Sequence, residues 1–386
     1  MKEVPLGELC TFCKGISVPR DQTSIAKTTP YLHYGDLYKK YDFRIDLDSV
    51  ADTIIKIDNI DKVTSEQYLH DGDVVYTLTS ETVDDLGHAT LVSNKTDSPF
   101  VAGMETTVIH ISRKDLILPA FLNYTFHSSC FKLKLRQYVT GMKVFRVHPR
   151  DLMRITINLA SLDVQKSIIG ILDALSDCIV CNSQINDYLM RTMNCIFEHA
   201  LVEKCAPVTV GEVIDLEDSK RIPLNKMQRE ARKGNYPYYG ATTIMGYVDD
   251  YLFDDIRLLL SEDGSVITNN DSPVLQYVWG RYWVNNHAHI LKSKGKYSLE
   301  MLYLALQHTT ITHLVTGAVQ MKISQGNLNS LILQLPDPDS IPCLSKMFEL
   351  YRNNIDVNMK LVATRDYLLP KLMSGEIDIS ILELSN

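Results

Sequence analysis

The sequence predicts an α+β protein in which two similar globular units are separated by a long antiparallel two-helix coiled coil. Two observations support this fold class: a pair of long heptad repeats, and a correspondence between the segments that precede them. In the first stretch, Leu162 to Leu201, seam residues recur at alternating steps of four and three, which is typical of a coiled-coil helix. Its seam positions are Ile168, Leu172, Leu175, Ile179, Asn182, Asn186, Leu189, Met193 and Ile196.

A second heptad stretch near the C-terminus repeats the first in phase. Each of its seam positions lies 176 residues after one of the first stretch. They are Leu344, Phe348, Tyr351, Ile355, Asn358, Val362, Arg365, Leu369 and Leu372. Two heptads in phase at one offset indicate an internal duplication. The alternative interpretation is two ordinary amphipathic helices within a single core.

The segments before the two heptad stretches also correspond. Val139-Thr140-Gly141 recurs as Val315-Thr316-Gly317, again 176 residues later, and Tyr239-Gly240 is interpreted as the equivalent of Tyr34-Gly35. The N-terminal ends of the segments are offset by 204 residues, so the first carries roughly 28 additional residues. The predicted domains are a first unit at 1–160, a helix at 161–204, a second unit at 205–336, a helix at 337–376 and a tail at 377–386.

The repeat predicts how the helices pair. A compact unit usually keeps its ends close together, so the second helix should run back along the first. About 33 paired residues would span roughly 50 Å, which predicts a dumbbell with pseudo-two-fold symmetry. We expect the seam asparagines to set the register, with Asn186 facing Asn358 and Asn182 against Val362. Unpaired buried amides cost about 1–3 kcal/mol each, so a slipped register would be disfavoured.

Composition limits the class of protein. The 386 residues are 45% hydrophobic and 22% charged, as in globular proteins of two to three domains. The start, MKEVPLGELC, has no apolar signal region, and the apolar runs are shorter than a membrane span, so we expect a cytoplasmic protein without a membrane partner. The two CxxC pairs begin at Cys10 and Cys178, too far apart for a common zinc site. We expect no metal and no cofactor.

The net charge of −8 argues against a general polyanion binder, but one segment is basic. Between Lys132 and Arg154, only Asp151 opposes seven Lys and Arg side chains. Such side chains can contact phosphates and guanine edges, whereas solvated loops are the alternative interpretation. The candidate DNA contacts are Tyr34, Thr79, Ser80, Lys132, Lys134, Arg136, Lys143, Arg146, Tyr239, Ser261, Asp263, Ser265, His287, Gln320 and Lys322.

The sequence offers little support for catalysis. It contains no GxxxxGK[ST] phosphate loop and no Asn-Pro-Pro-aromatic or Asp-Pro-Pro-aromatic tetrapeptide of amino methyltransferases. His287 and His289 should point to the same face of a strand. They could form a metal pair, but packed and hydrogen-bonded histidines are the favoured interpretation. We therefore expect a protein that is not an enzyme.

Several strings, in order, resemble the specificity subunit of type I restriction–modification systems. In the second unit they are YYGATTIMGYVDDYLFD from Tyr238, LLLSEDGSV from Leu258, YWVNNHAHIL from Tyr282 and TGAVQMKISQGNLNSLILQLP from Thr316. LLPKLMSGEI from Leu368 is similar to the end of that family's second conserved helix. The first unit fits less closely, since TLTSETVDDLGHA from Thr77 stands where the second unit has LLLSEDGSV.

The resemblance implies that each unit is a target-recognition domain that reads a short DNA half-site. The helices would set an unread spacer and dock two modification subunits that methylate adenine, and restriction subunits would join through the complex. The chemistry would then lie on these partners. Two alternatives stay open: the specificity part of a split or fused restriction–methylation enzyme, and a coiled-coil scaffold that binds no DNA.

Overall fold

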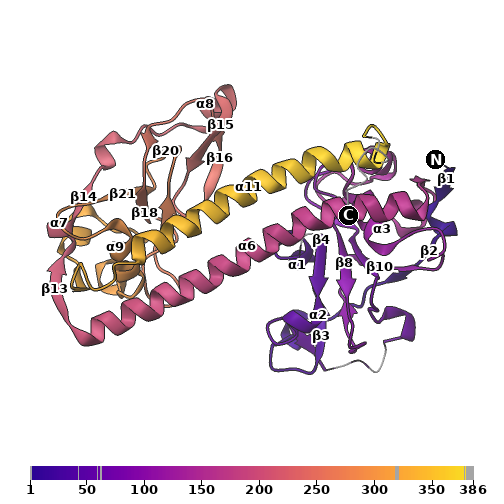
Figure 1. Ribbon diagram of the computed structural model, residues 1–386, viewed down its shortest axis with the longest axis horizontal. Coiled ribbons are helices and arrows are strands. Elements are labelled where there is room, and N and C mark those ends of the chain that lie inside the picture. Colours follow the sequence, from indigo (N-terminus) through magenta and orange to yellow (C-terminus); the bar gives the residue numbers. More distant parts are fainter. Residues whose placement is uncertain are drawn as a thin grey trace. The chain divides into compact units, whose positions relative to one another are not determined.

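The computed structural model describes residues 2–41, 43–58, 60, 63–317, 321–377 and 379. The chain divides into two compact units. The first comprises Met1–Val180 with Asn358–Asn386, and the second comprises Cys181–Val357. Each unit therefore holds part of α6 (Leu162–Glu203) and part of α11 (Leu344–Ser374), the long helices drawn in magenta and yellow in Figure 1.

The first unit is built on a sheet with the strand order β2-β10-β6-β8-β4. These strands are β2 (Cys10–Lys14), β4 (Phe43–Asp46), β6 (Val74–Thr77), β8 (Ala89–Ser93) and β10 (Thr106–Ile111). Only the pairing of β4 with β8 is parallel among these neighbours. The apolar runs that predict strands near residues 73–78 and 106–111 are confirmed as β6 and β10, which are largely buried.

Helices cover this sheet, and α3 (Pro119–His127) packs against β8. The apolar residues from Pro119 to Tyr138 recur at helical spacing, but the structure divides this stretch into successive shorter helices. The Ser128 side chain accepts a hydrogen bond from the Phe131 N–H (3.2 Å) and begins α4 (Ser129–Leu135), which is followed by the short helix η4 (Arg136–Tyr138).

The remaining elements of the first unit are short. A second sheet has the order β5-β3-β9, and β1 pairs with β12 while β7 pairs with β11. The strands are β1 (Lys2–Pro5), β3 (Thr29–Leu32), β5 (Lys56–Ile57), β7 (Thr79–Ser80), β9 (Val101–Ala102), β11 (Phe145–Arg146) and β12 (Thr156–Leu159). The helices are α1 (Tyr34–Lys39), α2 (Leu47–Val50), α5 (Pro149–Leu152), η1 (Leu6–Glu8), η2 (Arg20–Gln22) and η3 (Ser65–Gln67).

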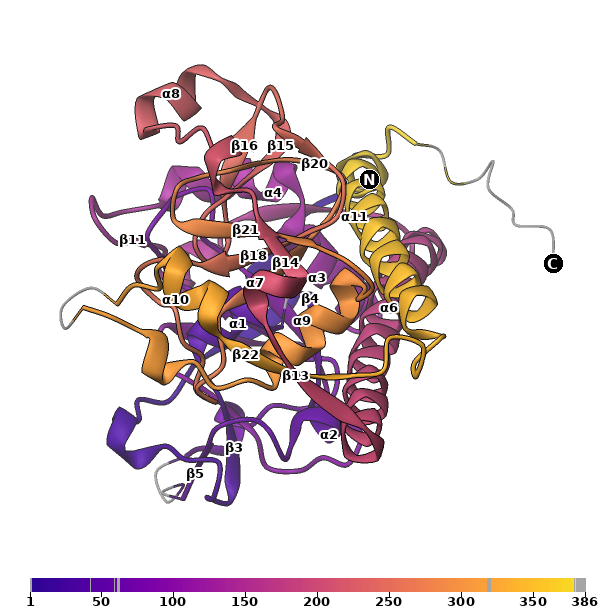
Figure 2. The same ribbon diagram turned by 90° about the vertical axis from the view of Figure 1, so that its left-hand side faces the viewer.

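The second unit contains two four-stranded sheets, ordered β14-β21-β18-β19 and β16-β15-β20-β17. Its strands are β14 (Ile214–Leu216), β15 (Lys233–Tyr239), β16 (Ile244–Val248), β17 (Phe253–Asp254), β18 (Arg257–Ser261), β19 (Leu275–Val278), β20 (Arg281–Val284) and β21 (Ala288–Ser293). β13 (Cys205–Thr209) pairs with β22 (Ile332–Pro336), as Figure 2 shows.

The helices of the second unit are α7 (Val210–Val213), α8 (Lys226–Ala231), α9 (Leu299–Gln307), α10 (Gln325–Ser330), η5 (Asp218–Lys220) and η6 (Thr312–Leu314). α9 has apolar residues on most of its surface, so it can lie in the core only if its polar N-terminus is satisfied. Ser298 meets this need by accepting a hydrogen bond from the Met301 N–H (3.1 Å).

The two units share one topology. The order β2-β10-β6-β8 in the first matches β14-β21-β18-β19 in the second, and β4 is an additional edge strand. In both units the first strand pairs antiparallel with the last. Each also has a short parallel pairing, β3 with β9 and β15 with β20, and the first unit has the parallel pair of β4 and β8 as well. The duplicated α+β fold predicted from the sequence is therefore confirmed, with a long helix linking two sheet domains.

Within each unit the two long helices run antiparallel. In the first, Ile168 and Leu172 of α6 share a buried core with Leu369 and Leu372 of α11. In the second, the shared core contains the buried α6 residues Met193, Phe197 and Ala200 and the α11 residues Leu344 and Phe348. All the predicted seam positions of both helices are buried or half-buried, which confirms the predicted apolar faces.

The predicted pairing of Asn186 with Asn358 is not what the structure shows. The buried Asn186 side chain donates to the Tyr351 carbonyl oxygen (3.1 Å) and accepts from the Asn354 amide (2.8 Å). Asn358 donates to the carbonyl oxygen of Ile179 (3.1 Å). The register is thus offset by about one turn from the prediction, because a seam amide can bond to a carbonyl of the facing helix and does not require the predicted partner. Asn182 lies half-buried one turn before Asn186.

A second expectation about α6 also requires correction. Among the described residues, α6 is the one helix with an 18-residue window apolar enough to cross a membrane by length and composition, with a mean hydropathy of 1.4. Both ends of α6 are built into the hydrophobic cores of the two units, and 17% of the apolar window is buried among the described residues. Length and composition alone are weak support for a membrane span.

The asparagine contact between the helices can be tested with a double substitution. Asn186→Leu should lower the free energy of unfolding by about 1–3 kcal/mol, because it leaves the Asn354 amide half-buried without this partner. Asn186→Leu with Asn354→Leu should recover much of that loss, since both polar partners are then replaced. Chemical denaturation of the full chain measures both values, and Gln184→Leu on the exposed side of α6 is the control. Equal stabilities of the single and double variants would contradict this contact.

Candidate nucleic-acid interface

A short hairpin projects beside the end of the central strand of the first unit. It is closed at Thr140 and Arg146, whose N–H groups each donate to the other residue's carbonyl oxygen, at 2.9 and 2.8 Å. Gly141 begins the turn with a φ of 108°, and a Cβ atom there would lie 2.1 Å from the Val144 carbonyl oxygen, so only glycine fits. The tip is exposed, and Met142 retains 94% of its accessible surface.

The hairpin is fixed to the sheet just beyond β6. The Val147 N–H donates to the Leu78 carbonyl oxygen (3.1 Å), and Arg146 and Phe145 pair with Thr79 and Ser80. The predicted candidates Thr79, Ser80 and Arg146 therefore lie together. Lys143 lies exposed at the tip and makes no ion pair with the described residues.

The second unit repeats this arrangement at the predicted offset. Thr316 and Lys322 exchange the same two backbone hydrogen bonds, at 2.9 and 2.8 Å, and Gly317 has a φ of 91°. The Ile323 N–H donates to the Glu262 carbonyl oxygen (2.9 Å), as Val147 does to Leu78 in the first unit. Gln320 lies outside the described residues, but the two hairpins are closed and attached in the same way.

Several predicted contacts of the first unit lie elsewhere. The Lys134 ammonium donates to Glu3 (2.9 Å) and to the Thr156 carbonyl oxygen (3.0 Å), so it holds β1 and β12 and is not free for a ligand. Arg136 is paired with Asp84. Lys132 is a half-buried residue of α4.

Tyr34 requires a correction because it is not the equivalent of Tyr239. The parallel strand pairs align Leu32 with Tyr239, since these residues occupy the same register opposite Ala102 and Val284. Tyr34 instead begins α1. One helical turn later, the Tyr38 hydroxyl donates to the Thr79 carbonyl oxygen (2.6 Å), so Tyr38 is the tyrosine beside the hairpin. Helical spacing from Tyr34 is the signal that could have found it.

The predicted residues of the second unit differ in accessibility. Ser261 is completely buried, and its hydroxyl donates to the Asp263 carbonyl oxygen (3.3 Å), so it cannot reach a ligand. The Asp263 carboxylate bonds to the half-exposed His287 ring (2.8 Å). Ser265 is exposed after the Gly264 turn. Tyr239 packs edge-on against Tyr282 and is half-buried, which raises the pKa of its hydroxyl to about 12.

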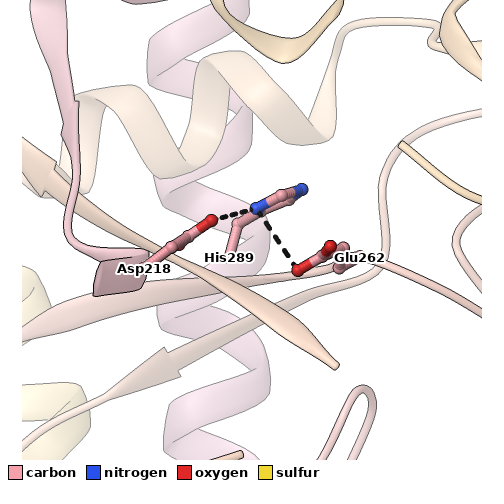
Figure 3. Close-up of side chains that lie close together, drawn as sticks. All are labelled: Asp218, Glu262 and His289. Carbon is pink, nitrogen blue, oxygen red and sulfur yellow. Dashed lines mark hydrogen bonds and ion pairs between the residues drawn. The ribbon is translucent and has the colours of Figure 1, made fainter. Parts of the chain in front are cut away.

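Asp218, Glu262 and His289 form a polar network (Figure 3), and His289 also contacts Ile323, the residue that follows the second hairpin. His289 is 1% exposed, and its Nδ1 lies 2.6 Å from an oxygen of Asp218 while its Nε2 lies 2.9 Å from the Ile323 carbonyl oxygen. Since a carboxylate and a carbonyl only accept, both ring nitrogens must carry protons. His289 is therefore an imidazolium ion that joins the sheet to the residue after Lys322.

The charges of this network balance locally. Burial alone disfavours the imidazolium, but the hydrogen bonds to Asp218 and Ile323 outweigh it and raise the pKa of His289. Burial likewise opposes ionisation of Asp218, but the bonds from His289 and the Ile290 N–H outweigh it and lower the pKa of the carboxyl. Arg221 donates to Glu262 (2.6 Å) and lies 3.4 Å from Asp218.

Asp218, Glu262 and His289 are also close enough to one another to be considered as metal ligands. The cationic groups around them argue for a different role. Arg221 contacts both carboxylates, Lys322 lies 3.1 Å from Glu262, and both nitrogens of His289 are engaged. A divalent cation would compete with these positive charges, so the group is better explained as an ion-pair network.

Sequence reasoning missed a second basic region, the segment 220–233. Six Lys and Arg side chains are opposed there only by Glu230, a pattern that is visible in the sequence. α8 lies in this segment, and two arginines stack on aromatic rings at its end. Arg229 lies 5.3 Å from the Tyr238 ring centre, and Arg232 lies 4.9 Å from that of Trp283. These contacts hold guanidinium groups at the surface of the second sheet.

The buried imidazolium makes a prediction about pH. Because the folded-state pKa of His289 is raised, its contribution to stability is complete below the unfolded-state pKa of about 6.5 and is lost as pH rises through the folded-state value. The lowered pKa of Asp218 adds stability that is lost only as pH falls below about 4. His289→Gln should therefore be most destabilising near pH 5–6, and less so toward pH 9. Denaturation across this range tests it, with His199→Gln as an exposed control. A difference that stays constant with pH would contradict the imidazolium.

Comparisons with known proteins show what this chain is similar to. Residues 203–341 match the family model for the type I restriction modification DNA specificity domain. The type I restriction enzyme specificity subunit S.HindORF215P of Haemophilus influenzae is 33% identical over 143 residues, which are 37% of this chain. The match spans 34% of the length of that relative.

A solved structure shares the fold over almost the whole chain. The type I restriction–modification S subunit from M. genitalium superposes with a TM-score of 0.55, covering 96% of this chain and 95% of that one, at 14% identity. At this identity the likeness concerns the fold alone. The matched domain, the related subunit and the shared fold together confirm that the chain resembles the specificity subunits of type I restriction–modification systems.

Proposed function

We propose that this chain is a sequence-specific DNA-binding subunit that reads a bipartite target, two half-sites separated by a spacer whose bases are not read. The observation that carries the proposal is the repeated hairpin. Each unit places a glycine-initiated turn, closed by Thr140 and Arg146 or by Thr316 and Lys322, at the end of a central strand. Two similar but non-identical surfaces in one chain suit two different short half-sites.

The chemistry of the hairpins supports DNA over other ligands. Lys143 and Arg146 in the first unit and Lys322 in the second carry exposed cationic groups. Lysine and arginine can neutralise phosphates or donate to the O6 and N7 atoms of guanine. The exposed side chains of Met142, Val144 and Met321 add apolar surface for base edges. The exposed side chains differ between the two hairpins, so each unit would read its own sequence.

We infer that the remaining parts serve a larger assembly. The recognition domains would lie at 1–160 and 205–336, with α6 and α11 setting the spacer. Modification subunits would dock on the helices and methylate adenine, and restriction subunits would join through the complex in the cytoplasm. The chain itself would carry no catalytic group and no cofactor. Sequencing of methylated adenines in cells that carry this chain and its modification partner would identify the target.

Removing one hairpin cation tests DNA binding directly. Lys143→Ala in the full chain should weaken binding to duplex DNA. If Lys143 contacts a phosphate, the loss should be similar for all sequences and the slope of log K against log salt should fall by about 1. If it contacts a base, the loss should be about 1–3 kcal/mol and confined to sequences carrying one half-site.

Lys95→Ala provides the matched control. Lys95 is exposed in the same unit, but it follows β8 near the start of β6, whereas the hairpin lies beyond the end of β6. It should leave binding unchanged. Wild-type chain that showed no salt-dependent affinity for DNA would reject the proposed function and favour a scaffold that binds only protein.

The spacer proposal makes a separate prediction. Inserting one heptad into both α6 and α11 should lengthen each helix by about 10 Å. At 3.4 Å per base pair this corresponds to roughly three additional unread base pairs in the target. Methylation mapping with the modification partner measures the spacing, and a heptad inserted into one helix alone is the control for general disruption. An unchanged spacer with both insertions would show that the helices do not set the spacer length.

A further inference from the structure

A carboxylate faces the closing cation of each hairpin. Arg146 lies 3.9 Å from Glu105, and Lys322 lies 3.1 Å from Glu262. Arg146 and Lys322 are equivalent residues, because each closes its hairpin by exchanging hydrogen bonds with Thr140 or Thr316. The closing cation of each hairpin therefore pairs with a glutamate.

The two carboxylates come from different parts of the fold. Glu262 follows β18, whereas Glu105 precedes β10, and its carbonyl oxygen accepts from the Leu78 N–H (2.8 Å) at the end of β6. Duplication of a single glutamate position therefore does not explain why both units have this ion pair. Each unit places a carboxylate beside its closing cation through a different residue, which points to a role for the carboxylate itself.

Glu262 can release its lysine without becoming unpaired. Arg221 donates to its other oxygen at 2.6 Å, and His289 lies 3.8 Å away. The Lys322 side chain is 53% exposed, whereas Glu262 is only 13% exposed. The lysine can therefore turn outward while the carboxylate keeps its buried partners. In the first unit Glu105 is 30% exposed and water can replace Arg146.

We propose that Glu105 and Glu262 are specificity-determining residues that compete with DNA for Arg146 and Lys322. This rests on the proposed function. On a random duplex, each cation would have to leave its carboxylate for a phosphate contact that carries no sequence information. On a correct half-site, the other contacts of the hairpin hold the DNA close enough for the exchange. Specificity is a difference between affinities, so the carboxylates increase it by weakening the incorrect complex.

The test is a double-substitution cycle in the full chain with a random-sequence duplex of about 30 base pairs as the probe. Glu262→Gln should bind this duplex about two- to fivefold more tightly, the range expected for freeing one partly exposed ion pair. Its slope of log K against log salt should be steeper by about 0.9. Against a duplex enriched from a random pool, the gain should be smaller, so discrimination should fall.

Lys322→Gln separates this effect from a general change of charge. If Glu262 acts through the lysine, Glu262→Gln should have no effect on random-duplex binding once Lys322 is replaced. Glu198→Gln removes the same charge from the exposed surface of α6 and should leave binding unchanged. Glu105→Gln, tested with Arg146→Gln, repeats the cycle at a carboxylate that is 30% exposed, so it applies even if Glu262→Gln fails to fold.

The outcomes are distinguishable. Wild-type chain without salt-dependent DNA binding overturns the proposed function. If the wild-type chain binds DNA but Glu262→Gln and Glu105→Gln leave the affinity unchanged, the proposed competition is wrong. It is also wrong if these substitutions raise the affinity equally with and without the hairpin cation. In both cases DNA recognition itself is not contradicted. A gain on the random duplex that disappears with Lys322→Gln or Arg146→Gln supports it.

Discussion

The structure depends on the burial of one end of each long helix in the core of each unit. Leu172 and Leu369 are buried in the first core, and Phe197 and Phe348 in the second. Truncating such side chains typically costs 2–5 kcal/mol. Polar contacts then fix the helices more specifically than apolar burial can. Asp173 accepts from Arg44 (2.7 Å) and Tyr124 (2.6 Å) in the first unit, and Asp356 accepts from Trp279 (3.0 Å) in the second.

Much of this architecture was predictable because it follows from periodicity. Heptad spacing identified the faces of α6 and α11, and the 176-residue offset identified the duplicated fold. The register was not predictable in the same way. Apolar seam positions accept several registers at similar energy, and Asn186 found its partners on Tyr351 and Asn354, one of them a backbone carbonyl. A carbonyl is present at every position of the facing helix, so it leaves no signal in the sequence.

In the candidate interface, too, the backbone was easier to predict from the sequence than the contacts of individual side chains. The glycines at 141 and 317 mark a backbone requirement, so their repeat correctly aligned the two hairpins. Individual side chains were harder to place, since Lys134 and Ser261 belong to residue types that suit a DNA contact but are used inside the fold. The network of His289, Asp218 and Arg221 joins residues that are distant in sequence. Its charged state arises only when burial and hydrogen bonding act together.

The net charge of −8 bears on how such a protein could select DNA. Screening limits electrostatic attraction to about 8 Å at physiological ionic strength, so distant charges contribute little once the surfaces meet. The cations that matter are then those on the hairpins, and two of the three hairpin cations described in the two units already face carboxylates. If the chain has the proposed function, its attraction to arbitrary DNA would be weak, because these carboxylates already neutralise two of the hairpin cations. Affinity would come from short-range contacts that form only when the shape and base edges of a half-site fit the hairpin.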